Sequence, residues 1–144
     1  MTKYPVVLVH GLVAKDFPFC RAFGKVPAFL RKQGIRVYVT NQDGVGAIAT
    51  NAQQLKEEIE HICQAEACDK VNIIAHSKGG VDARYMISRL GMHTRVASLT
   101  TMSTPHHGSH LSATVLSLPR WLIHLPCFFI NGFYRLMGDA HPDI

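Results

Sequence analysis

Four short runs of apolar, mostly β-branched residues recur along the chain, separated by longer mixed segments. They lie at residues 5–9, 36–40, 71–75 and 96–102. The continuous apolar run at residues 5–9 predicts a strand that is buried on both faces, and each of the other three segments also predicts a strand. The stretches between them carry apolar residues at helical spacing, at about residues 25–33, 51–65 and 80–90. Strands that alternate with helices predict an α/β fold with about four strands in a mostly parallel sheet and helices on both faces.

Start and stop signals delimit these helices. Pro27 is tolerated in the first turn of the first helix, and Gly34 is its stop signal. In the second helix Leu55 and Ile59 share one face, and Gly91 ends the third. No internal repeat interrupts the pattern, so the 144 residues form one domain or part of one.

Composition excludes several classes of protein. Hydrophobic residues make up 47% of the chain and charged residues only 17%, which excludes a disordered chain. The net charge of +5 comes from scattered lysines and arginines, without a basic run that contains aromatic residues. We therefore expect no nucleic-acid partner. The positive charge would serve solubility and give the protein a weak preference for anionic interfaces.

The cysteines and the first residues bear on the compartment. Four cysteines show neither C-x-x-C nor zinc-knuckle spacing, which favours unpaired thiols in a reducing compartment; they are Cys20, Cys63, Cys68 and Cys127. Residues 1–5 lead directly into the first predicted strand without the features of a signal peptide. As written, the sequence predicts a cytoplasmic protein, with secretion open if a leader was removed.

The run at 71–75 leads into a serine that small residues flank on both sides. Ala75 stands two positions before Ser77 and Gly79 two positions after it, so the pattern is A-x-S-x-G. A buried strand, a sharp turn and a helix directly behind the serine are the marks of a nucleophile elbow. The Lys78 N–H would lie at the positive end of that helix, where it can stabilise an oxyanion. The alternative is a structural serine in an ordinary strand–loop–helix connection.

The first predicted strand also ends in a loop that fits this chemistry. Gly11 follows His10 and permits a tight backbone turn over the sheet edge. In a serine hydrolase such a loop supplies a second oxyanion donor, which here is the Leu12 N–H. His10 has two possible roles, as a catalytic base or as a residue that pins the loop through ring hydrogen bonds. We favour the second.

Three ordered motifs carry a family resemblance over about residues 4–109: V-H-G-L at 9–12, A-H-S-K-G-G at 75–80 and S-T-P-H-H-G-S at 103–109. Together they resemble the bacterial triacylglycerol lipase and esterase branch of the α/β-hydrolase superfamily. The resemblance implies that Ser77 is the nucleophile and that the Leu12 and Lys78 amides form the oxyanion hole. It also implies that His10, His76 and His106 line the cleft.

The resemblance further predicts the order of the strands. The four strands would be the third to sixth of the full fold, side by side in the order fourth, third, fifth, sixth. The last of them would then present an unpaired edge. His106, His107 and His110 can also be read as a metal cluster, but no carboxylate or thiolate completes the set. We predict neither a metal nor a cofactor.

Beyond residue 108 the chain becomes densely apolar, although Arg120, His124, Pro126 and other polar residues interrupt it. A transmembrane helix needs about 18 or more nearly uncharged apolar residues, which this segment lacks. The resemblance implies a lid over the cleft that contacts a lipid–water interface transiently. An ordinary pair of core helices is the alternative. We expect residues 1–108 to be the N-terminal part of the hydrolase core and 109–144 a lid-like helical segment.

The resemblance leaves the catalytic acid and base unaccounted for. Such enzymes place them after two later strands, in the order Ser, Asp or Glu, His. Asp139 and His141 have that order, but they stand two residues apart with no strand between them, so we reject them. We expect the acid and the histidine beyond this chain, the C-terminal part of the fold to be missing, and the fragment alone to be inactive.

The predicted function is therefore a serine carboxylester hydrolase, a lipase or esterase, that forms an acyl-enzyme on Ser77. Its partner would be a small-molecule ester or a lipid. Thioesterase or acyltransferase activity on the same fold is one alternative, and a non-catalytic lipid- or partner-binding module is another. The sequence does not indicate an oligomeric state.

Overall fold

A computed structural model describes residues 2–11, 23–43 and 46–108 of the chain. Its elements in order are β1 (Val6–Val9), α1 (Val26–Lys32), β2 (Val37–Val39), α2 (Ile48–Ala65), β3 (Val71–His76), α3 (Lys78–Arg89), a short 3₁₀ helix (Met92–Thr94) and β4 (Val96–Met102). Within these residues all strand pairs are parallel, and the order across the sheet is β2-β1-β3-β4. The predicted parallel sheet and its strand order are confirmed.

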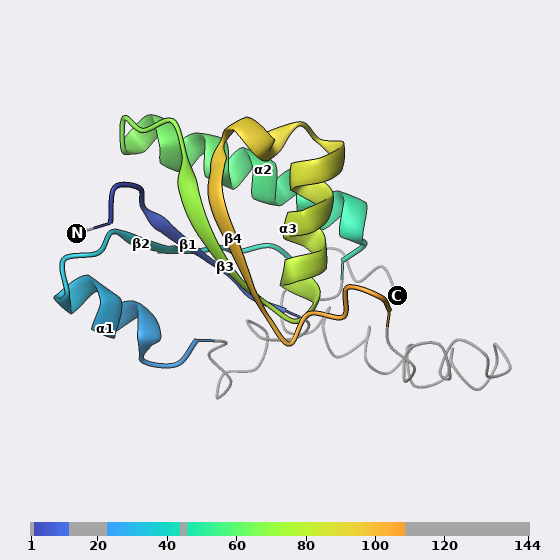
Figure 1. Cartoon of the computed structure of the whole chain (residues 1–144), viewed down its shortest axis with the longest axis horizontal. Helices are drawn as coiled ribbons and strands as arrows, with labels where there is room; N and C mark the ends of the chain where they lie inside the picture. Colours follow the sequence, from blue (N-terminus) through green and yellow to red (C-terminus); the bar gives the residue numbers. More distant parts are fainter. Residues whose placement is uncertain (1, 12–22, 44–45, 109–144) are drawn as a thin grey trace, which may run out of the picture.

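Helices cover both faces of this sheet, as Figure 1 shows, with α2 and α3 on one face and α1 on the other. Alternate residues of β1 supply the two cores. Val7 and Val9 pack with α2 and α3, whereas Val6 and Leu8 pack towards α1. Because all four residues are buried, β1 is an uninterrupted run of apolar residues and does not alternate between apolar and polar ones.

The larger core lies between the sheet and the helices α2 and α3. Leu55 and Ile59 of α2 and Met86 of α3 are fully buried there against Val7 and Ile73 of the sheet. Burial of one such side chain contributes roughly 1.5–3 kcal/mol. This core therefore fixes α3, and with it the turn at the start of α3, against the central strands.

The element limits differ from those predicted at several ends. Helix α2 begins at Ile48 rather than near residue 51, and its N-cap, Ala47, makes no side-chain capping bond. Strand β2 is only three residues long.

Two elements at the margins of the sheet are poorly buried. Helix α1 has no buried residue, and its Phe29 is 61% exposed. Strand β4 pairs with β3 alone among the described residues and has no buried residue.

The end of α2 is tied to β2 by a carboxylate. Glu66, the C-cap residue, accepts hydrogen bonds from the Tyr38 hydroxyl and, at 2.6 Å, from the Arg36 guanidinium. These donors hold the pKa of Glu66 below its ordinary value, Tyr38 having the larger effect. The same carboxylate raises the pKa of Tyr38. Glu66 thus fixes the α2 terminus to the sheet.

Among the helices of the described residues, none has the length and apolar character needed to span a membrane.

Truncation of Ile59 to alanine should lower the free energy of unfolding by about 2–5 kcal/mol, because it opens a cavity in the larger core. Ile48→Ala makes the same change on the same helix at a side chain that is 39% exposed. It should cost less than about 1 kcal/mol. Urea unfolding followed by circular dichroism measures both, and equal losses would contradict the packing described for α2.

Glu66→Gln should lower the midpoint of thermal unfolding most at neutral pH. A carboxyl whose pKa is lowered in the folded state adds stability above its unfolded pKa, and this is lost as the pH falls through the folded value. The difference between wild type and Glu66→Gln should therefore shrink from pH 7 towards pH 3. Glu57→Gln, on the exposed face of α2, is the control. A difference that grows in acid would contradict the assignment.

Candidate active site

Ser77 occupies a strained turn at the carboxyl end of the central strand β3. Its φ of 52° and ψ of −127° lie in a region that non-glycine residues rarely adopt. Strain of this kind costs about 1–3 kcal/mol and persists only where the surroundings enforce it. Here the Ser77 N–H donates to the Met102 carbonyl at 2.8 Å, and the Ser77 carbonyl accepts from Gly80 N–H at 3.1 Å. The turn is thus held from both β4 and α3.

Close backbone approach explains two glycines at this turn, Gly11 in the loop after β1 and Gly79 in the first turn of α3. A Cβ on Gly11 would lie 2.8 Å from the Ser77 Cβ and 2.9 Å from the His76 carbonyl oxygen. A Cβ on Gly79 would collide with the His10 carbonyl. The sequence pattern required a small residue at 79 for the turn between β3 and α3. The backbone that lies closest to Gly79 is instead that of the β1 exit, so the turn at Ser77 and the loop after β1 pack directly against each other.

The Lys78 amide begins α3 directly behind Ser77. The backbone N–H groups in the first turn of a helix have no intrahelical partners and carry partial positive charge. The Lys78 nitrogen would be 3.4 Å from a Cβ on Gly11, which puts the β1 exit, Ser77 and this amide side by side. Leu12, the second predicted donor, lies outside the described residues.

The Lys78 side chain enters a buried polar network that connects α3 with α2. Its ammonium nitrogen lies 3.1 and 3.2 Å from the two carboxylate oxygens of Asp82, which is 1% exposed. The Asn51 amide donates to Asp82 at 3.3 Å and to the Asp43 carbonyl at 2.6 Å. Burial raises the pKa of Asp82, while Lys78 and Asn51 oppose the rise. Asp82 is thus an interior residue of the helix behind Ser77 and not a surface one.

The predicted cleft histidines take three different places. His10 is 3% exposed; its Nδ1–H donates to the Gly11 carbonyl at 2.9 Å, and its own carbonyl accepts from Gln42 at 3.2 Å. This geometry fits a residue that pins the loop. His76 is the last residue of β3 and is half-buried.

His106 lies where the T-P-H segment folds back on α3 and β4. The Arg84 guanidinium donates to the His106 carbonyl at 3.0 Å and to its Nδ1 at 3.2 Å. Since a guanidinium only donates, His106 Nδ1 accepts, and its Nε2 carries the proton that faces the Thr101 hydroxyl at 3.1 Å. Arg84 therefore anchors this loop from the exposed side of α3, a role that its sequence position alone did not reveal.

The model of a family described as palmitoyl protein thioesterase matches residues 5–134. A triacylglycerol lipase of Pseudarthrobacter phenanthrenivorans is 33% identical over 152 residues, which cover 97% of this chain and 46% of that protein. A triacylglycerol lipase of Burkholderia plantarii is also 33% identical, over 97% of this chain and 41% of its own length. The chain thus spans less than half of these curated relatives.

Solved structures agree with the fold. The mature form of Bacillus licheniformis lipase BlEst2 superposes with a TM-score of 0.68 at 27% identity, over 80% of this chain and 46% of that one. A metagenomic carboxyl esterase, MGS0156, has a TM-score of 0.65 at 24% identity, over 77% of this chain and 33% of its own. The resemblance to lipases and esterases, and the α/β-hydrolase fold, are confirmed.

Replacement of Ser77 tests the strain in the turn. Glycine adopts positive φ without a side-chain penalty, whereas alanine keeps it. Ser77→Gly should therefore be more stable than Ser77→Ala by about 1 kcal/mol, although glycine normally destabilises through its unfolded-state entropy. Chemical denaturation of the two variants measures the difference. A more stable alanine variant would show that the turn is not strained.

Proposed function

The chain belongs to the palmitoyl protein thioesterase family, and on that premise we propose that it carries the nucleophile of a serine hydrolase that cleaves carboxylic esters. The observation that supports this most directly is the backbone of Ser77, a non-glycine residue at φ 52° between a central strand and a helix. Such a turn lifts the hydroxyl away from the sheet. Ser77 is half-buried, so its side chain is not part of the core.

In the proposed reaction the Ser77 Oγ attacks the carbonyl carbon of the ester. Its proton passes to a histidine base. This histidine and the catalytic acid would both lie outside the described residues. The tetrahedral oxyanion is held by the amides of Lys78 and Leu12, and an acyl-enzyme forms on Ser77 as the alcohol leaves with the proton. Water then attacks the acyl group and releases the acid. Loss of one oxyanion donor typically costs about 2.7–4 kcal/mol of transition-state stabilisation.

The remaining predicted parts belong to the same proposal. His10 would hold the loop that carries Leu12, because its ring hydrogen bond closes on Gly11. His76 and His106 would border the substrate at the carboxyl ends of β3 and β4. Residues 109–144, which lie outside the described residues, would cover the cleft at a lipid–water interface.

A second candidate is thioester hydrolysis, favoured by the name of the matching family. The curated relatives named triacylglycerol lipase favour oxygen esters instead. Both reactions use the same nucleophile and the same oxyanion donors, so the backbone of the elbow does not distinguish them. The leaving group does, and the comparison of rates on matched substrates separates the two.

A fluorophosphonate probe tests whether Ser77 is the nucleophile. Labelling of a longer protein that contains this chain should be lost in Ser77→Ala. Ser103→Ala is a matched control, because Ser103 also has a φ of 52° and directly follows the neighbouring strand β4. It should keep the label. Labelling that survives in Ser77→Ala would remove Ser77 from the mechanism.

Hydrolysis of palmitoyl p-nitrophenyl ester and palmitoyl-coenzyme A by the longer protein identifies the leaving group. We expect the oxygen ester to be cleaved faster, and the Ser77→Ala variant to lose both activities. Faster cleavage of the thioester would favour the second candidate. Lipid binding without cleavage or labelling would favour a non-catalytic binding module.

A further inference from the structure

Helix α2 ends in a Schellman motif that brings two cysteines together. Ala67 has a φ of 47°, its N–H donates to the Gln64 carbonyl at 3.2 Å, and the Cys68 N–H donates to the Cys63 carbonyl at 3.0 Å. This pair of bonds defines the motif, in which the side chains at its two ends characteristically contact each other. Here those ends are Cys63 and Cys68, and both thiols are free.

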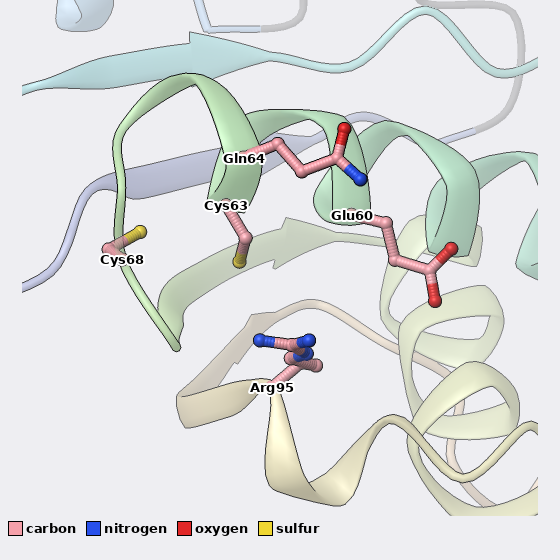
Figure 2. A pocket seen from close by; sticks show the side chains of 5 residues that line it. All are labelled: Glu60, Cys63, Gln64, Cys68 and Arg95. Carbon is pink, nitrogen blue, oxygen red and sulfur yellow. The ribbon is translucent and has the colours of Figure 1, made fainter.

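The two cysteines line one pocket of about 280 Å³ together with Glu60, Gln64 and Arg95. Figure 2 shows the Cys63 thiol pointing from α2 into this pocket, on the side where Arg95 lies. Cys68 precedes β3 and Arg95 precedes β4, so the pocket lies at the amino ends of these strands. Ser77 lies at the opposite end of β3. The pocket is therefore separate from the proposed active site.

The two thiols differ in accessibility. Cys63 is 5% exposed, and its thiol pKa is raised to about 11, chiefly by burial and then by the neighbouring Cys68, while Arg95 opposes the rise. Cys68 is only half-buried and donates to the Lys70 carbonyl at 3.4 Å. A partly accessible thiol next to a buried one is the arrangement of an attacking and a resolving cysteine.

We propose that Cys63 and Cys68 form a dithiol modification site that is oxidised to a disulfide by a small, carboxylate-bearing disulfide such as oxidised glutathione. Arg95 is the cation that holds a carboxylate of the reagent at the pocket, across from Glu60. Because the motif already joins the two backbones by a hydrogen bond, ring closure needs little backbone movement. The proposal does not depend on the activity of Ser77.

The exchange proceeds in two balanced steps. The Cys68 thiolate attacks one sulfur of glutathione disulfide, the S–S bond breaks, and one glutathione leaves as a thiol with the proton from Cys68. The Cys63 thiolate then attacks the sulfur of Cys68 and displaces the second glutathione, which takes the proton from Cys63. Two electrons pass from the cysteine pair to the reagent, which is reduced to two thiols.

Peptide mapping of the full chain tests the proposal. The reduced protein is incubated with oxidised glutathione, quenched with acid, alkylated with iodoacetamide and cut with trypsin. Cleavage after Lys56 and Lys70 releases peptide 57–70, which contains Cys63 and Cys68 and neither of the other two cysteines. We expect this peptide to be two hydrogen masses lighter and not alkylated, and dithiothreitol to restore both alkylation sites.

Three variants identify the roles of the residues. Cys63→Ser should retain one glutathione on Cys68, because the resolving thiol is absent. Arg95→Gln should slow oxidation several-fold, whereas Arg89→Gln, an exposed arginine at the end of α3, should leave the rate unchanged. Circular dichroism of the reduced variants checks that they are folded.

Two results would overturn the proposal. In one, wild-type peptide 57–70 stays alkylated at both cysteines or stops at the glutathione adduct. In the other, Arg95→Gln and Arg89→Gln oxidise at the same rate as wild type.

Discussion

The candidate site depends on the close packing of the β1 exit against the turn between β3 and α3. Gly11 lies so close to Ser77 that even one added methyl group would meet the serine Cβ at 2.8 Å. Gly79 lies still closer to the His10 carbonyl. Because the two segments leave neighbouring parallel strands at the same edge of the sheet, their register brings them together: Val9 pairs with Ala75. The strain at Ser77 persists because this packing, and the hydrogen bond that the Ser77 N–H donates to the Met102 carbonyl, hold the turn in this conformation.

Beneath this contact, buried polar groups fix the helix that follows the serine. The half-buried Lys78 pairs with the buried Asp82, and Asn51 joins this ion pair to α2 and to the Asp43 carbonyl. Removal of one partner from such a buried pair leaves an uncompensated charge, which costs far more than the loss of a surface pair. On the other side, Arg84 holds His106 and the loop after β4. The start of α3 behind Ser77 is therefore held by contacts with the β1 exit, with α2 and with the loop after β4.

Sequence patterns predicted the strands and the serine turn because each depends on local signals, whereas the order of the strands came from the family resemblance. Apolar runs mark the buried strands, and a serine between small residues marks the elbow. The start of α2 was less accessible to prediction because Ala47 provides no side-chain cap. In the sequence Lys78 and Asp82 look like an ordinary surface pair at helical spacing, but Asp82 is buried and accepts a hydrogen bond from Asn51 of another helix. The Schellman motif at the end of α2 carries alanine where glycine is the usual signal.

The structure of a phosphonate adduct would test the account most directly, because it locates both the nucleophile and the charge that develops on the substrate. We expect a covalent bond to the Ser77 Oγ and a phosphonyl oxygen about 2.7–3.1 Å from the Lys78 nitrogen. A phosphonate bound to another side chain, or an oxygen directed away from the start of α3, would contradict it.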